Sequence, residues 1–107
     1  MRRRSRDDAD TLAAVFRSLR EFFKLTKGEL PLRSALVLFC LATNGNEEGN
    51  MTFGELVLET GLQRTTTSHI ITALIKKKLV ESFESLEDRR VTYLRLTEHG
   101  WGLIGLK

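Results

Sequence analysis

The sequence has only one cysteine, Cys40, one proline, Pro31, and two histidines. One cysteine cannot form an intramolecular disulfide, and the histidines lie too far apart to show the spacing of a metal site. No apolar run approaches the roughly 18 to 20 residues that a membrane span needs, and no apolar segment follows the N-terminal arginines as in a secretory signal. We therefore expect a cytoplasmic protein with no metal or cofactor. Cys40 is expected to pack as a small buried hydrophobic group, with a redox-sensing thiol as the alternative.

The basic residues of this mildly basic sequence are clustered rather than spread evenly along it. The 107 residues are 41% apolar, which suits one domain with a modest core, and the net charge is +3. Basic residues gather at the N-terminus, at Lys76 to Lys78 and at Arg89 to Arg90. This grouping favours a polyanionic partner, although solvated charge is the alternative. We predict a flexible basic arm over residues 1–6, which holds Arg2, Arg3, Arg4 and Arg6, and a single domain over residues 7–107.

Two helices are predicted in the first half of the chain. The first, over roughly residues 8–25, carries one apolar stripe and ends at Gly28. The second begins with Pro31 in its first turn and runs to about Thr43. Since it is apolar nearly all round, we expect other elements to cover it on several sides. The stripe of the first helix consists of Leu12, Val15, Phe16, Leu19, Phe22 and Phe23.

A helix-turn-helix is predicted next. Thr52 and Glu55 have the spacing of a capping box, which opens a short helix ending at Glu59 or Thr60. Gly61 permits a tight turn, and a longer helix follows over residues 64–78.

Two strand-like runs, 80–86 and 91–96, then flank a charged turn and predict a β-hairpin. A final short helix, capped by Thr97, contains Trp101. The fold class expected is mainly α with a small β-hairpin, a winged helix-turn-helix.

The helix over 64–78 has two different sides. Apolar residues and Thr67 share one side, which we expect to pack on the core, whereas small polar side chains occupy the other. Such a polar side suits close approach to the major groove of DNA. The alternatives are a merely solvated surface and lysines that only complement the helix C-terminus. The DNA contacts expected from this segment are Gln63, Arg64, Thr65, Thr66, Ser68, His69, Thr72 and Lys76.

The turn of the hairpin, over residues 86–91, forms the expected wing. Arg89 and Arg90 lie at its tip, where a guanidinium can reach the minor groove or a phosphate. Asp88 cannot favour phosphate, and we expect it to support the wing by bracing the tip or an arginine. An ordinary charged hairpin turn is the alternative.

Residues 88–100 contain an Asp-Arg-Arg tip, five strand residues and a Leu-Thr-x-x-Gly sequence, and in this they resemble the wing of the MarR family of transcription regulators. Residues 62–80 also resemble the recognition segment of that family. Lys78 stands where the family commonly has glycine, so we expect a locally different helix end. The resemblance implies a homodimeric repressor that reads a pseudo-palindromic site with two recognition helices and two wings.

The sequence stops at Lys107, where that family continues into long dimerisation helices. We expect a dimer of this chain to use the first helix and the tail instead. The residues expected at the dimer interface are Leu12, Phe16, Leu19, Phe23 and Trp101.

A transcriptional repressor is the leading interpretation. A DNA-binding protein of a plasmid, phage or mobile element, acting in partition, replication or packaging, fits the same residues. A winged-helix adaptor for protein contacts is an alternative of another class. An enzyme is not expected, because the sequence shows no nucleophile–base pair, metal cluster or phosphate-cradling glycine loop.

Overall fold

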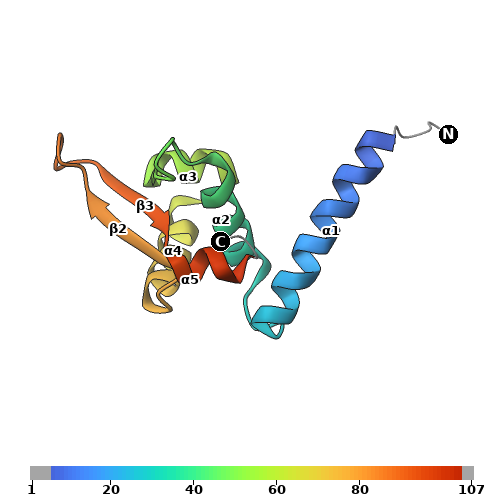
Figure 1. Ribbon diagram of the computed structural model, residues 1–107. Coiled ribbons are helices and arrows are strands. Elements are labelled where there is room, and N and C mark those ends of the chain that lie inside the picture. Colours follow the sequence, from blue (N-terminus) through green and yellow to red (C-terminus); the bar gives the residue numbers. More distant parts are fainter. Residues whose placement is uncertain (1–5, 105–107) are drawn as a thin grey trace.

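The computed structural model describes residues 6–104, which form helices and a small antiparallel sheet in the arrangement of a winged helix-turn-helix. The predicted fold class is therefore confirmed. In Figure 1, α1 projects from one side of the body and the β2–β3 hairpin projects from the other. The elements in order are α1 (Arg6–Thr26), α2 (Leu32–Asn44), β1 (Met51–Thr52), α3 (Phe53–Thr60), α4 (Arg64–Lys76), β2 (Val80–Glu84), β3 (Thr92–Leu96) and α5 (Glu98–Leu103).

Helix α1 begins earlier than predicted, at Arg6, so this residue of the expected arm belongs to the helix. Arg2, Arg3 and Arg4 lie outside the described residues. Acidic residues in the first turn complement the helix dipole. The helix ends at Thr26, and the next two residues, Lys27 and Gly28, both have positive φ. This left-handed turn directs the chain from α1 into α2.

Helix α2 lies at the centre of the body, and Val37 and Leu38 are fully buried. Cys40 is also buried, which raises the pKa of its thiol. We expected other elements to cover α2 on several sides. This holds for the side with Val37 and Leu38, but Leu32 and Leu36 are exposed on the side next to α1. Pro31 is the N-cap residue and precedes the first turn.

The sheet has the strand order β1-β3-β2, and each neighbouring pair is antiparallel. The predicted hairpin is present, with Val80 opposite Leu96 and Glu84 opposite Thr92, although β2 ends two residues before the predicted limit. Strand β1 was not predicted, since two residues carry no readable alternation. Met51 of β1 is buried and pairs with Leu94, which ties the start of α3 to the hairpin.

Helix α3 begins with the predicted capping box. The Thr52 hydroxyl accepts from the Glu55 backbone N–H at 3.1 Å, and the Glu55 carboxylate accepts from the Thr52 N–H at 2.9 Å. Gly61 follows α3 with φ 71°, as its turn requires. No helix within residues 6–104 is long and apolar enough to cross a lipid bilayer.

Helix α4 ends at Lys76, two residues before its predicted end. Lys78 adopts φ 62°, and the Leu79 N–H donates to the Leu74 carbonyl at 3.0 Å, which makes a Schellman motif. Leu74 and Leu79 are both buried and supply the hydrophobic contact of that motif. Lys78 thus stands in a conformation that favours glycine.

Candidate nucleic-acid interface

The two sides of α4 divide largely as its sequence predicts. Thr67, Ile71 and Leu74 are buried against the core, and Ile70 is half-buried. Ile75 departs from the expectation, because it is 37% exposed. The expected DNA-contacting residues of this segment are all exposed except Thr66, which is half-buried: Gln63, Arg64, Thr65, Ser68, His69, Thr72 and Lys76.

The threonine-rich start of α4 is compatible with a helix because some hydroxyls bond back to the preceding turn. Thr67 donates to the Gln63 carbonyl at 2.9 Å, which satisfies a hydroxyl that has no exposed surface. Thr72 donates to the Ser68 carbonyl at 2.9 Å but stays exposed. Its hydroxyl oxygen can still accept a hydrogen bond and its methyl group can still contact a base edge.

The N-terminus of α4 carries a guanidinium held in place by an aromatic ring. The guanidinium carbon of Arg64 lies 5.0 Å from the centroid of the Phe53 ring, within the range of a cation–π interaction. Phe53 is the first residue of α3, so the two helices of the helix-turn-helix meet at this contact. Sequence reasoning did not single out Phe53, because its partner lies across the turn.

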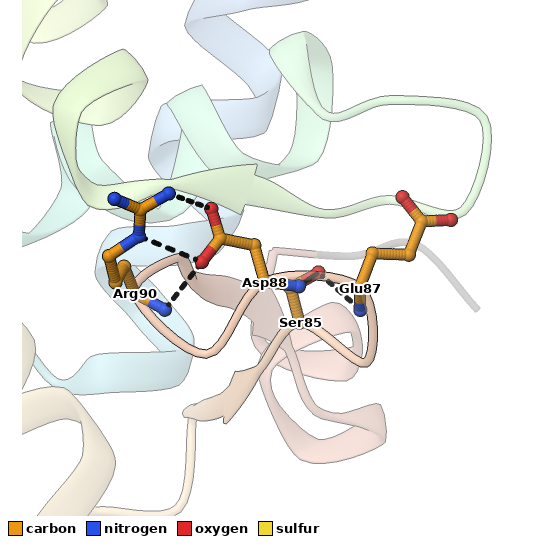
Figure 2. A network of polar contacts seen from close by, with 4 residues as sticks. All are labelled: Ser85, Glu87, Asp88 and Arg90. Atoms are coloured by element: carbon orange, nitrogen blue, oxygen red, sulfur yellow. Dashed lines mark hydrogen bonds and ion pairs between the residues drawn. The ribbon is translucent and has the colours of Figure 1, made fainter.

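The wing tip is organised by side-chain contacts to its own backbone (Figure 2). The Ser85 hydroxyl accepts from the N–H groups of Glu87 and Asp88 at 3.2 and 3.3 Å. Asp88 in turn binds Arg90 through its backbone N–H and its guanidinium. These hydrogen bonds from Arg90 lower the pKa of Asp88. The contact fixes the start of the Arg90 side chain while 91% of that side chain stays exposed.

Arg89, the other arginine of the tip, is exposed and makes no hydrogen bond or ion pair with any residue of the described range 6–104. The two arginines therefore differ in the free protein. Arg90 is partly oriented by Asp88, whereas the Arg89 guanidinium has all its donors available.

The wing is joined to α4 by contacts at the base of the hairpin. The Thr97 hydroxyl donates to the Lys78 carbonyl at 2.6 Å, and the Thr97 N–H donates to the Leu79 carbonyl at 3.1 Å. Gly100 packs so closely on this turn that an added Cβ would collide with the Leu79 carbonyl oxygen. The end of α4, the base of the wing and the start of α5 therefore form one packed junction.

The residues expected at a dimer interface lie in two places. The α1 stripe is exposed along the projecting helix: Leu12 is 64% exposed, Phe16 62%, Leu19 41% and Phe23 65%. Trp101, by contrast, is half-buried and packs against the core. An apolar groove of about 670 Å³ runs between α1 and α2, lined in part by Leu19, Leu32 and Leu36.

Comparison with known proteins gives one family. A sequence model of the MarR family matches residues 29–91, which include α2, the helix-turn-helix, β2 and the wing tip. No protein of curated function matches the chain significantly.

Solved structures of the same fold include AbsC, a MarR family transcriptional regulator from Streptomyces coelicolor. AbsC is 22% identical in sequence to this chain, with a TM-score of 0.66. The match covers 97% of this chain and 72% of the AbsC chain. A MepR mutant from S. aureus bound to an oligodeoxyribonucleotide is 17% identical, with a TM-score of 0.70 and coverage of 95% and 72%. BpsR from Bordetella bronchiseptica, whose DNA binding is regulated by 6-hydroxynicotinic acid, is 22% identical, with a TM-score of 0.64 and coverage of 91% and 67%.

Proposed function

The chain belongs to the MarR family, and on that premise we propose that it is a sequence-specific double-stranded DNA-binding regulator of transcription. Its simplest mode of action is repression by a homodimer that occupies promoter DNA in the cytoplasm, at the nucleoid. The proposal contains no catalytic step and no cofactor, in keeping with a family of transcription regulators.

The observation that carries the proposal is the pairing of two exposed surfaces. One is the polar side of α4, and the other is the wing tip with Arg89 and Arg90. The Lys78–Thr97 contact ties the end of α4 to the strand that returns from the wing. A helix in the major groove with a basic hairpin at the neighbouring minor groove is a known mode of duplex recognition.

The two surfaces supply different parts of recognition. Short polar side chains of α4, such as Thr65, Ser68 and His69, let the helix approach the base edges closely, so they can distinguish sequences. The uncapped α4 N-terminus and Arg64 favour phosphate, which positions the helix without reading sequence. Arg89 and Arg90 add contacts in the minor groove or to its phosphates, and Asp88 holds the wing in shape.

The exposed α1 stripe supports the homodimer of this proposal. Leu12, Phe16, Leu19 and Phe23 lie at helical positions four, three and four apart, which places them on one side of α1. Covering this apolar side with a second copy is favourable relative to leaving it in contact with water. Two copies would present two α4 helices to paired half-sites.

The test is selection of preferred duplexes from a random pool, followed by footprinting of the winners. We expect an enriched sequence with two inverted half-sites, about one helical turn or a multiple of it apart. Enrichment without any shared sequence would leave only non-specific binding. No retention of duplex even at low salt would favour the adaptor and overturn the proposal.

Genomic mapping of binding sites then separates regulation from plasmid or phage functions. Single sites at promoters are expected for a repressor. Clustered arrays of repeated sites away from promoters would contradict regulation and favour partition or replication.

A further inference from the structure

A pocket of about 810 Å³ lies between the loop that precedes β1 and the β2–β3 hairpin. Glu47 and Glu48 line it from the loop, and Glu84 and Glu87 line it from the hairpin. Among the described residues that line it, Arg95 alone is basic, so carboxylates predominate there in a protein whose net charge is +3. None of the expected DNA contacts lines this pocket, and its carboxylates would repel the phosphates of a duplex.

Most of these carboxylates are unpaired. The side chains of Glu47, Glu84 and Glu87 form no hydrogen bond or ion pair with any residue between 6 and 104, and Figure 2 shows Glu87 pointing away from Arg90. In this part of the chain, no three His, Cys, Asp or Glu side chains are grouped so that they could hold a metal ion. The separated carboxylates therefore suit an extended ligand with several positive charges better than a single metal ion.

Asn50 gives a second and independent indication of a ligand. It is the one buried residue among those that line the pocket, and it is only 5% exposed. Its Nδ2 donates to the Glu48 carboxylate at 3.4 Å, which sets the orientation of the amide. Its Oδ1 has no hydrogen-bond partner within the described residues. An unpaired buried acceptor costs free energy, so a donor from a ligand is expected there.

The hairpin side of the pocket is aromatic. Phe83 and Tyr93 are half-buried and lie opposite each other in the hairpin, with ring centroids 5.8 Å apart. The guanidinium carbon of Arg95 lies 4.8 Å from the Phe83 centroid, so this ring already binds one cation. Because Arg95 donates to Glu81 at 2.6 Å, outside the pocket, it leaves the carboxylates of the pocket available. Aromatic rings beside free carboxylates suit an organic cation whose methylene groups can pack on the rings.

We propose that this pocket binds an aliphatic polyamine, a small flexible molecule whose ammonium groups are joined by methylene chains. One ammonium donates to Asn50 Oδ1 and pairs with Glu48, which turns to the ligand from its long contact with the Asn50 amide. A second ammonium pairs with Glu84 and Glu87, while the methylene chain lies along Tyr93. The ligand therefore bridges the loop before β1 and the wing. Its binding is measured without DNA, so this site can fail while the proposed function stands.

The main experiment is a calorimetric titration with spermidine, a triamine, at physiological ionic strength, where diffuse attraction between charges is screened. We expect one site per chain. Glu84→Gln and Glu87→Gln should each weaken binding about two- to fivefold, as for exposed ion pairs. Glu29→Gln makes the same change of charge outside the pocket and should leave the affinity unchanged. Equal effects of all three variants, or no binding by the wild type, would overturn the proposal.

Asn50→Ala tests the buried acceptor. Stability should change little, because Oδ1 has no internal partner, whereas affinity for spermidine should fall about tenfold, as for a hydrogen bond to a charged group. Asn44→Ala removes an exposed amide outside the pocket and should not change the affinity. Thermal unfolding verifies that both variants are folded, and the glutamate variants keep the test decisive if Asn50→Ala is not. Wild-type affinity in a folded Asn50→Ala variant would overturn the site.

Amide NMR locates the ligand and identifies its class. With spermidine, signals of residues 46–50 and 83–87 should shift together, and they should shift less in Glu84→Gln. Mg²⁺ alone and a synthetic peptide of residues 1–6 are the competing cations. Tighter binding of Mg²⁺ would indicate a metal site, and tighter binding of the peptide would assign the pocket to the basic N-terminal segment. Either result, or spermidine shifts confined to other parts of the chain, would overturn the polyamine assignment.

Discussion

The Asp88 carboxylate holds Arg90 by three hydrogen bonds at the tip of the wing. Oδ1 accepts from the Arg90 backbone N–H at 3.0 Å and from Nε at 3.1 Å, and Oδ2 accepts from Nη2 at 3.2 Å. Because two of these bonds reach the guanidinium side by side, the arginine has a preferred direction before it meets DNA. Arg90 is therefore preorganised for contact with DNA, and two predictions follow from this.

Asp88→Asn should weaken duplex binding several-fold without unfolding the protein. The amide oxygen can still accept from the Arg90 backbone, but the ion pair that orients the guanidinium is lost. In the wild type the pKa of Asp88 is lowered by Arg90, so the ion pair is complete above the ordinary aspartate pKa. It should be lost only as pH falls through the lowered value, below about 4.

Between pH 5 and pH 8 the contribution of Asp88 to duplex affinity, measured by fluorescence anisotropy, should therefore stay constant. A transition that Asp88→Asn removes within that range would contradict this account of the wing.

Arg90→Ala should weaken binding to the selected duplex by roughly 1–3 kcal/mol, as expected for an arginine that reads a groove. Arg17→Ala, on α1 and remote from the wing, removes the same charge and is the control. Titrations of both variants at one salt concentration give the comparison. Equal affinity of the two variants would remove the wing from the mechanism.

Much of this interface was predictable because it depends on residue spacing within single helices and at their ends. The spacing of Thr67, Ile71 and Leu74 set the buried side of α4, and the Thr52–Glu55 pair set the start of α3. Features that depend on contacts between distant segments were not predictable. The Arg64–Phe53 contact, for example, requires the turn that brings α3 and α4 together.

The spacing of apolar residues also predicted burial wrongly at some positions, because spacing does not show which other element covers a residue. Leu32 and Leu36 fit a helix buried all round, yet they border the open groove beside α1. The same holds for Ile75, which continues the apolar side of α4 past the point where the core ends. Strand β1 was missed because its two residues gain strand geometry only by pairing with β3.

Lys78→Gly should stabilise the protein by roughly 0.5–1 kcal/mol. A lysine with φ 62° is in the left-handed region, which is unfavourable for a residue with a Cβ and not for glycine. Lys77→Gly removes the same charge at φ −83°, where lysine is unstrained, and should be neutral or destabilising. Urea denaturation of both variants gives the comparison, and equal effects would mean that Lys78 carries no backbone strain.

Gly100→Ala should destabilise the protein by roughly 1–3 kcal/mol, since the new methyl group collides with the Leu79 carbonyl. Gly102→Ala is the matched control on the same helix, because an added Cβ there meets no atom within 4 Å. Thermal unfolding distinguishes the two variants. A stable Gly100→Ala protein with normal DNA affinity would show that the junction of α4, wing and α5 can shift at no cost.

Phe16→Glu should dissociate the proposed homodimer and, with it, binding to paired half-sites. Phe16 is 62% exposed on α1 and lies in the middle of the stripe formed with Leu12, Leu19 and Phe23. A carboxylate in that position would have to be desolvated at the interface between two copies. Arg17→Glu places a carboxylate on the opposite side of the same helix and should leave the dimer intact.

Sedimentation velocity measures the assembly state, and anisotropy measures affinity for a full site and for a half-site. The expected result is a monomeric Phe16→Glu variant that binds the full site no better than the half-site, while Arg17→Glu keeps the advantage of two half-sites. A dimer that persists in Phe16→Glu would place the interface elsewhere than the α1 stripe. A wild-type protein that is monomeric at micromolar concentration, both free and on the full site, would reject the homodimer itself.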